Sequence, residues 1–256
     1  SNTTAFASPS INHTGTLALN ADSTNTVVLA SVLSGNGSLI IDGPGGGTTY
    51  KNRVVLRGIG TSRTGNISVI NTGKLWVDRN IPEALGTSTI VDIGAAGGFY
   101  IYGGTGGSAG NLTAVTIGGL TGTGGVFGDT SGGTATLTIG GGNASATFDG
   151  TIGSSNSGVL NLIKVGTGTQ MLTGTSNYTG ATTINSGTLR VDFSLGGVSN
   201  IFSPSTAVTL GGGTLEIKGG SGETNTQTIN GISGFGTVQL TPNGATSVTT
   251  TLGAIG

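Results

Sequence analysis

The chain is built from short stretches in which apolar and polar residues alternate. One pattern recurs, a small residue and a polar residue followed by apolar–any–apolar, at residues 15–19, 37–41, 73–77, 187–191, 213–217 and 236–240. Such alternation places apolar side chains on one face of a β-strand and polar side chains on the other. The pattern therefore predicts many short strands, with these residues inside: Leu39, Ile41, Leu75, Val77, Leu189, Val191, Leu215 and Ile217.

The strands recur at a nearly fixed spacing. Neighbouring glycines that open the pattern lie 22–26 residues apart, and a second series ending at Gly94, Gly118 and Gly140 steps by 24 and then 22 residues. Short strands at such a period are typical of a β-solenoid. We expect a single all-β solenoid domain over residues 1–256, with about eleven coils and a length on the order of 50 Å. Only residues 80–85 could form a turn of helix.

The scarcity of charge favours a solenoid over a β-sandwich, which also uses many short strands. Charged residues make up 7% of the chain, and the net charge is -1. Residues in register on successive coils stack about 4.8 Å apart, where two like charges cost roughly 0.9 kcal/mol in water and about four times as much at a surface dielectric near 20. Stacked Thr, Ser and Asn carry no such penalty, because they can hydrogen-bond along the stack. A solenoid therefore selects against surface charge.

The composition also excludes several classes of protein. The 34% of hydrophobic residues argue against disorder, and five prolines argue against collagen. Nine basic residues against ten acidic ones give no excess for binding nucleic acid, and no apolar run is long enough for a membrane span. There is no cysteine, and the nucleotide-binding, phosphate-loop and calcium-roll motifs are missing. We expect no cofactor, no metal site, no nucleic-acid partner and no membrane span.

A longer motif lies within residues 148–191. It reads KVGTGTQMLTG over residues 164–174 and TSNYTGATTINSGTLRV over residues 175–191. This motif resembles the autotransporter-associated β-strand repeat of large bacterial surface proteins, whose pattern is K-x-G-x-G-T, L-T-G and then Y-T-G-x-T-x-I-x-x-G-T-L. Ser176 stands where that family commonly has Asn, and weaker copies lie at residues 83–87 and 208–215. The resemblance implies a right-handed parallel β-helix outside a bacterial cell, acting as a stalk or adhesin, with no catalytic residues in the repeat.

Candidate catalytic groups are few. His13 is the only histidine and has the setting of a plain surface residue, although a catalytic triad would have to use it. Asp22 and Asp42, and likewise Asp129 and Asp149, are 20 residues apart, so either pair could stack and bind a cation or act as acid and base. The Asp-Gly pairs at residues 42–43 and 149–150 are also typical of turns. We expect no catalytic site.

Basic and aromatic residues gather in one region. Six of the nine basic residues fall between positions 51 and 79: Lys51, Arg53, Arg57, Arg63, Lys74 and Arg79. If Leu75 and Val77 point inward, then Lys74, Trp76 and Asp78 point outward. By the same alternation, inward Phe99 and Ile101 leave Tyr100 and Tyr102 outward.

Trp76 and Tyr100 are 24 residues apart, which is one period, so their rings are expected on neighbouring coils. Exposed Trp and Tyr beside Arg are favoured at protein interfaces and sugar platforms. One hypothesis is an interface or glycan site formed by Lys74, Trp76, Tyr100, Tyr102, Arg53 and Arg57. The other is a solvated basic face beside a purely structural aromatic ladder.

Three functions remain as hypotheses. The leading one is a non-enzymatic structural protein, extracellular or on a bacterial cell surface, acting as a stalk, an adhesin or a fibre subunit. The second is a module that binds a surface glycan or a host-cell partner through the aromatic and basic region. The third is a polysaccharide-cleaving β-helix enzyme, which would need clustered acids and bases. Because residues 1–10 and 246–256 carry no charge to block a strand edge, we also expect end-to-end self-association or continuation in a longer parent chain.

Overall fold

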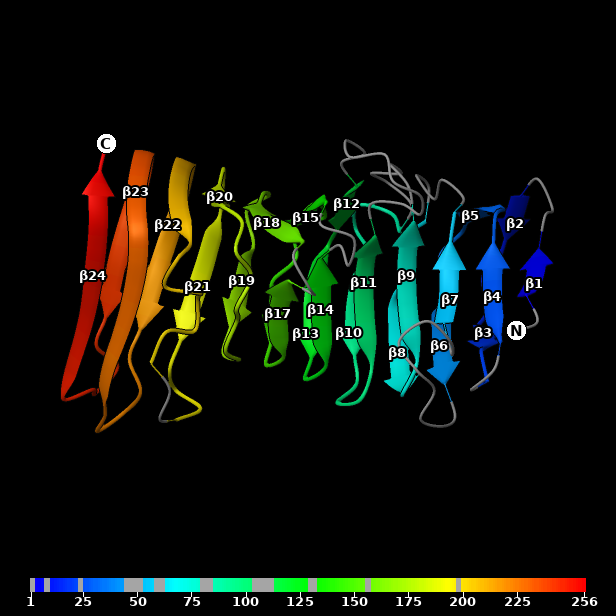
Figure 1. The fold of residues 1–256 in the computed structure, drawn as a ribbon, viewed down its shortest axis with the longest axis horizontal. Helices are drawn as coiled ribbons and strands as arrows, with labels where there is room; N and C mark the ends of the chain where they lie inside the picture. The colour runs from blue at the N-terminus through cyan, green and yellow to red at the C-terminus, as the bar shows by residue number, and fades with distance from the viewer. Residues whose placement is uncertain are drawn as a thin grey trace.

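Each strand of the chain lies beside strands about one period away in the sequence, and every pair is parallel. The computed structural model describes residues 3–6, 10–22, 25–43, 53–57, 63–78, 85–102, 113–128, 133–154, 158–196 and 199–256, and these ranges contain no helix. Figure 1 shows the strands stacked side by side from β1 at one end to β24 at the other. The protein is therefore a β-solenoid of about nine turns.

The strands form two long sheets and one short one. One sheet has the order β1 (Thr3–Phe6), β4 (Thr26–Leu29), β7 (Arg53–Leu56), β9 (Lys74–Asp78), β11 (Gly98–Tyr102), β14 (Gly125–Gly128) and β17 (Thr151–Ser154). The other begins with β12 (Thr113–Ile117), β15 (Thr134–Ile139), β18 (Val159–Lys164), β20 (Thr182–Ile184) and β22 (Ala207–Lys218). It continues through β21 (Thr188–Asp192), β19 (Thr169–Leu172), β16 (Ala146–Phe148), β13 (Gly119–Gly122), β10 (Ile90–Ile93), β8 (Ile67–Asn71), β6 (Leu39–Gly43) and β3 (Leu17–Asn20).

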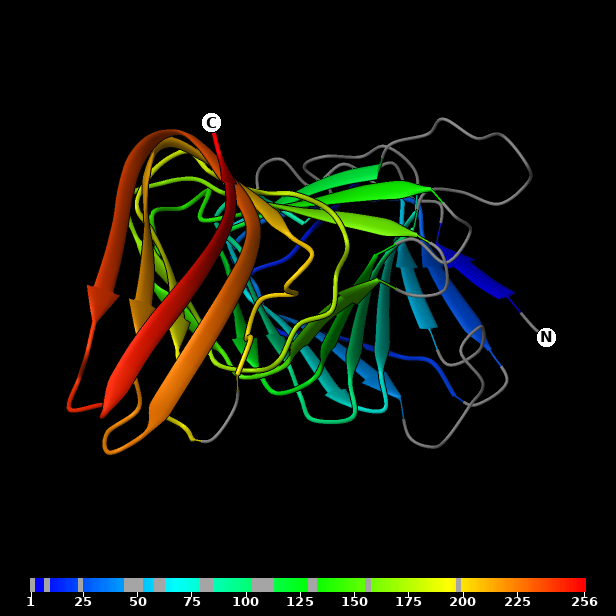
Figure 2. The same ribbon diagram turned by 60° about the vertical axis from the view of Figure 1, so that its left-hand side comes forward.

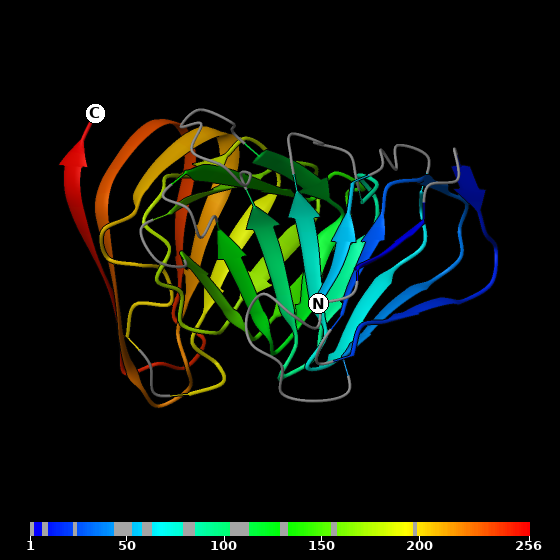
Figure 3. The ribbon, with the colours of Figure 1, turned by 45° about the vertical axis from the view of Figure 1, so that its right-hand side comes forward.

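The long C-terminal strands join the two runs of the second sheet. Residues 208–210 of β22 pair with β20, and residues 214–218 of the same strand pair with β21. Strands β23 (Thr224–Thr241) and β24 (Ser247–Ile255) follow β22, and Figure 2 shows these three strands bending together around the solenoid. Strand β2 (Ser10–Asn12) pairs with β5 (Val32–Ser34) near the N-terminal end, which Figure 3 brings forward.

Apolar side chains fill the inside of the coils. The eight residues that alternation predicts inside, at positions 39, 41, 75, 77, 189, 191, 215 and 217, are all 0% exposed. The register stacks like on like, because Leu189 pairs with Leu215 and Val191 with Ile217 on parallel strands. Full burial of such a side chain stabilises the fold by about 1.5–3 kcal/mol. The all-β parallel solenoid and its predicted core are confirmed, while its handedness and the count of about eleven coils stay predictions.

Lys164, the first residue of the repeat motif, lies inside the solenoid with its side chain fully buried. Its Nζ donates hydrogen bonds to the carbonyl oxygens of Val165 at 2.5 Å, Gly166 at 3.1 Å and Ser186 at 3.4 Å. Burial lowers the pKa of Lys164. The ammonium thus ties two successive coils together through carbonyls that the strand ladder leaves free, which gives a physical reason for lysine at the start of the motif.

Gln170 performs the same task across three coils. Its Oε1 accepts a hydrogen bond from the Leu120 amide at 3.0 Å, and its Nε2 donates to the Leu120 and Ala146 carbonyls at 3.1 and 3.3 Å. Gln227 is similarly placed, since its amide accepts from and donates to the backbone of Phe202. These inward amides are buried and satisfied, so we interpret them as structural.

Candidate functional site

The outer face of the first sheet carries a ladder of aromatic rings. Trp76, Tyr100 and Phe127 are in register on β9, β11 and β14. The rings of Trp76 and Tyr100 stack with centroids 4.9 Å apart and an interplanar angle of 17°, and those of Tyr100 and Phe127 with 5.0 Å and 28°. Sequence spacing predicts the first of these pairs, and the structure confirms it. We call these three residues the aromatic ladder.

The expected exposure of Trp76 is wrong. Its ring points away from the main core, as alternation predicts, but it is only 2% exposed and packs in a separate cluster with Val28, Val55 and Tyr100. The Arg53 guanidinium carbon lies 4.8 Å from the centroid of the Trp76 ring, in cation–π geometry. Neighbouring rungs therefore cover the indole, and it cannot serve as an open platform for a sugar or a partner.

The other predicted members of the patch behave differently from one another. Arg57 is exposed, Lys74 is half-buried, and burial lowers the pKa of Lys74. Tyr100 is half-buried, and burial raises the pKa of its hydroxyl. The side chain of Tyr102 lies outside the described residues, as do Lys51, Arg79 and the proposed helical turn at residues 80–84. The structure thus brings Arg53, Lys74 and the two stacked rings together.

A hollow of about 350 Å³ lies beside the aromatic ladder. Its floor follows a second outward ladder, in which Lys74, Gly98, Gly125 and Thr151 are in register on β9, β11, β14 and β17. Figure 1 shows these four strands lying side by side. Because two successive rungs are glycine, a gap is left between the side chains of Lys74 and Thr151. We call this gap the trough.

The rings lean over the glycines that form the trough. A Cβ atom on Gly98 would lie 2.5 Å from Cε2 of Tyr100, and one on Gly125 would lie 2.4 Å from Cζ of Phe127. Sequence reasoning missed Phe127, although a signal was present: Gly98-Phe99-Tyr100 and Gly125-Val126-Phe127 share a glycine two residues before an outward ring. Glycine at that position makes room for the ring to fold back along its own strand.

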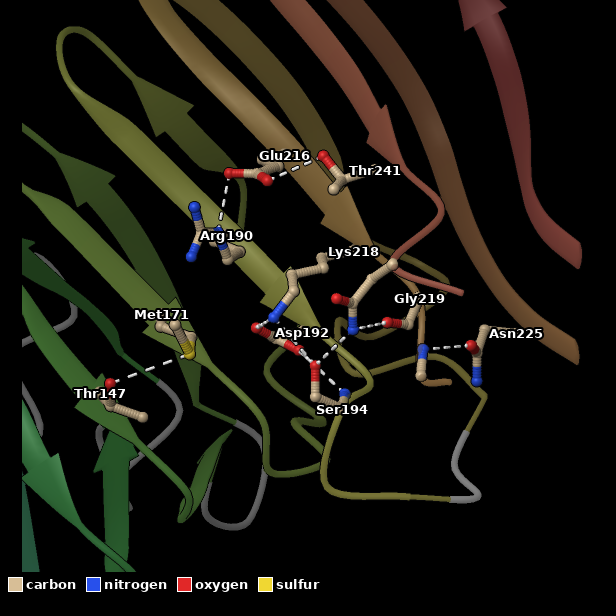
Figure 4. A network of polar contacts seen from close by, with 12 residues as sticks. Thr147, Met171, Arg190, Asp192, Ser194, Glu216, Lys218, Gly219, Asn225 and Thr241 are labelled. Carbon is tan, nitrogen blue, oxygen red and sulfur yellow. Dashed lines mark hydrogen bonds and ion pairs between the residues drawn. The ribbon is translucent and has the colours of Figure 1, made fainter. Parts of the chain in front are cut away.

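The second sheet carries a network of opposite charges, shown in Figure 4. Arg190 Nε lies 2.7 Å from Glu216 Oε2, and Lys218 Nζ lies 3.1 Å from Asp192 Oδ2. Glu216 also accepts a hydrogen bond from Thr241 at 2.9 Å, and Lys218 donates to Ser194 at 3.0 Å. Each carboxylate in the network already has a cation and a hydroxyl or amide donor.

Asp192 is the most tightly held of these carboxylates. Burial by itself would raise its pKa, but hydrogen bonds from the Ser194 side chain and backbone and from Lys218, with the charge of Lys218, together lower the pKa below its ordinary value. A carboxylate whose charged form is held in this way is a poor general acid or base near neutral pH. We therefore interpret the network as structural.

The remaining candidate catalytic groups do not converge. Asp42 is in register with Asn20, not with Asp22, so the predicted stack of Asp22 on Asp42 is wrong. Asp129 lies outside the described residues, and Asp149 accepts a hydrogen bond from Thr173 at 2.6 Å. No group of three His, Asp or Glu residues close enough to hold a metal ion occurs within the described ranges.

His13 and Arg63 form a contact that sequence reasoning did not expect. Arg63 is 1% exposed, so the view of it as a solvated basic residue is wrong, and burial lowers its pKa to about 10. Its Nη1 lies 2.8 Å from Nε2 of His13, and its Nη2 donates to the carbonyls of Gly37 and Asn66. The contact links three successive coils at the N-terminal end and has no acidic member in the part of the chain described.

Two known groups of proteins match this chain. The passenger-associated-transport-repeat family matches residues 162–191, which include Lys164 and Gln170. The chain is also 35% identical over 250 residues to the adhesin BmaC autotransporter of Brucella suis biovar 1 (strain 1330). That match covers 90% of this chain and 7% of the adhesin, so the chain spans a small fraction of its relative's length.

Within the described ranges, no helix has both the length and the apolar character needed to cross a membrane.

Proposed function

We propose that this chain, an autotransporter passenger segment with β-strand repeats at the cell surface or outside the cell, is a non-enzymatic structural and adhesive rod. The support comes from the passenger repeat at residues 162–191 and from the similarity to an adhesin autotransporter. The observation that carries the non-enzymatic part is the paired state of the charges. Arg190 with Glu216 and Lys218 with Asp192 neutralise each other across coils instead of facing a cleft.

Surface display tests the adhesive role. The chain would be displayed on a non-adherent bacterium through a carrier, and bacteria bound to cultured cells and to immobilised matrix would be counted. We expect more bound bacteria than with the carrier alone. Equal binding, with display verified by antibody, would contradict the adhesive role and leave only the structural one.

An enzyme panel tests the non-enzymatic role. Incubation of the purified chain with pectin, other acidic glycans and acyl esters should release no product. Steady product release that disappears in Asp149→Asn would overturn the proposal, because it would assign a catalytic carboxylate to the solenoid.

We further propose that the C-terminal end of the solenoid associates with another coil in parallel register. Large apolar side chains are exposed there on β23 and β24: Phe235 at 74%, Val238 at 38%, Leu240 at 50% and Ile255 at 75%. The residues of β3 offer a matching pattern, since Leu17 and Leu19 alternate with polar or small residues as Val238 and Leu240 do. A second copy stacked head to tail, or further coils of a longer chain, would cover these side chains.

Light scattering on the purified chain tests this association. We expect a mass that rises with concentration and a return to monomer in Leu240→Lys, which places a charge on the exposed edge. A dispersed monomer at high concentration would reject association between copies.

A further inference from the structure

We infer that the trough beside the aromatic ladder is a binding site for an uncharged glycan chain lying along the solenoid axis. The floor of the site is Gly98 and Gly125, its side wall is formed by Tyr100 and Phe127, and Thr151 closes one end. The inference adds a ligand class to the proposed function, and it rests on that function only because a surface passenger meets glycans outside the cell.

The shape of the trough suits a chain-like ligand. Lys74 and Thr151 are separated by three rungs, which at the spacing between parallel strands is about 14 Å. The volume of about 350 Å³ lies at the small end of the range for ligand pockets. The repeat of one rung is also of the same order as the length of a hexose unit in an extended glycan, so sugar units can follow the rungs.

The chemistry of the walls suits the two kinds of surface that a sugar presents. The edges of the Tyr100 and Phe127 rings, with Ala95 and Ala96 across the trough, offer apolar contact to the C–H faces of a hexose. The exposed side chains of Thr123 and Thr151 offer hydroxyl groups to sugar hydroxyls. Gly98 and Gly125 let the ligand approach the backbone closely, since no side chain stands above the floor.

The Tyr100 hydroxyl supplies an independent pointer to a ligand. The ring is held between Trp76 and Phe127, and its hydroxyl lies on the side of Gly98, 3.2 Å from where a Cβ of that residue would be. Within the described ranges no residue forms a hydrogen bond with this hydroxyl, and burial is the cause of its raised pKa. A half-buried phenol held rigidly and aimed into a hollow is poised to bond with a bound hydroxyl.

Charge decides in favour of an uncharged glycan. Lys74 is the only charged residue among those that line the trough in the described part of the chain, and it stands at one end. An acidic polymer would place a carboxylate on successive rungs, where Gly98 and Gly125 provide no counter-charge. A neutral chain needs only the hydroxyl, ring and backbone groups that the trough provides.

Binding of soluble oligosaccharides to the purified full chain tests the inference. Isothermal titration and saturation-transfer NMR would use linear neutral oligomers of glucose, galactose and N-acetylglucosamine, with oligogalacturonate as the acidic arm. We expect one neutral class to bind, and Tyr100→Phe to weaken it about 3- to 10-fold, as for loss of one hydrogen bond. Gly98→Ala should abolish binding, because the added methyl group displaces the Tyr100 ring into the trough.

Two matched controls separate the site from general effects. Gly15→Ala adds a methyl group where nothing lies within 4 Å, and Phe235→Ala removes an exposed ring elsewhere, so both should bind like the parent chain. Circular dichroism would verify the fold of each variant. Binding of the acidic oligomer alone, binding that Tyr100→Phe and Gly98→Ala leave unchanged, or no binding by any neutral oligomer would overturn the inference. None of these outcomes affects adhesion by the displayed chain, so the two proposals fail separately.

Discussion

Arg190 and Glu216 occupy neighbouring rungs of one outward ladder, and their side chains meet at 2.7 Å. Two residues further along the same strands, Asp192 faces Lys218 with the signs reversed. The four charges form a checkerboard in which each one has an opposite neighbour both along its strand and across to the next. The solenoid thus tolerates charge where the stacking repulsion is converted into attraction.

Reversal of one charge in the checkerboard should destabilise the protein. Glu216→Lys places a like charge next to Arg190, at a spacing where repulsion is about 1–4 kcal/mol between water and a surface dielectric near 20. Glu216→Gln should cost less, since it removes the attraction without adding repulsion. Urea denaturation would measure both. The double variant Arg190→Glu/Glu216→Arg should recover most of the loss, and failure to recover would show that the pair is not the cause.

Stability should fall in acid because of Asp192. Its pKa in the folded chain is lowered, so its contribution is fully present above the unfolded value of about 3.9 and is lost as the pH falls through the lower folded value. Thermal unfolding between roughly pH 6 and pH 2 would measure the loss. Asp192→Asn should be less stable at neutral pH and should have a flatter acid profile. Parallel profiles for the two proteins would contradict this assignment.

A methyl group at Gly140 should be far more harmful than one at Gly15. Gly140 has φ of 99°, and an added Cβ would lie 2.0 Å from the Val165 carbonyl oxygen. Gly140→Ala should therefore lower the free energy of unfolding by about 2 kcal/mol or more. Gly15→Ala meets no atom within 4 Å and should be neutral. Similar urea midpoints for the two variants would show that the turn at Gly140 is not fixed by its backbone.

The buried lysine of the repeat should matter more than the half-exposed one. Lys164→Met leaves the carbonyls of Val165, Gly166 and Ser186 without their shared donor, a loss of about 1–3 kcal/mol. Lys218→Met removes an ion pair at the surface and should cost about 0–1 kcal/mol. Hydrogen exchange should also rise selectively in the coils around β18 and β21 for the first variant. Equal effects of the two substitutions would argue against a structural role for Lys164.

Trp76, the only tryptophan, should report its own burial. At 2% exposure beneath Arg53 and against Tyr100, its fluorescence should be blue-shifted and poorly quenched by acrylamide. Arg53→Ala uncovers part of the indole and should increase the quenching. An emission typical of free indole in the parent chain would contradict the packing of this cluster.

Part of the candidate site could be predicted from local sequence. Alternation places Trp76 and Tyr100 on the outer face, and the 24-residue period places them on neighbouring coils, where they do stack. Phe127 was missed because the next coil is longer: Tyr100 pairs with Phe127 at a spacing of 27 residues. Coil length depends on the loops, and a fixed period cannot anticipate it.

The sequence by itself determined the strands, their inward residues and the solenoid, because alternation and glycine punctuation act over a few residues. Only the tertiary structure decided which outward side chains are covered. Trp76 and Arg63 are buried because their neighbours on adjacent coils happen to be a ring and a ring of carbonyls and imidazole. Asp42 met Asn20 instead of Asp22 for the same reason. The register between coils is a long-range property, fixed by how the whole apolar interior packs, and two residues of shift are enough to change every outward partner.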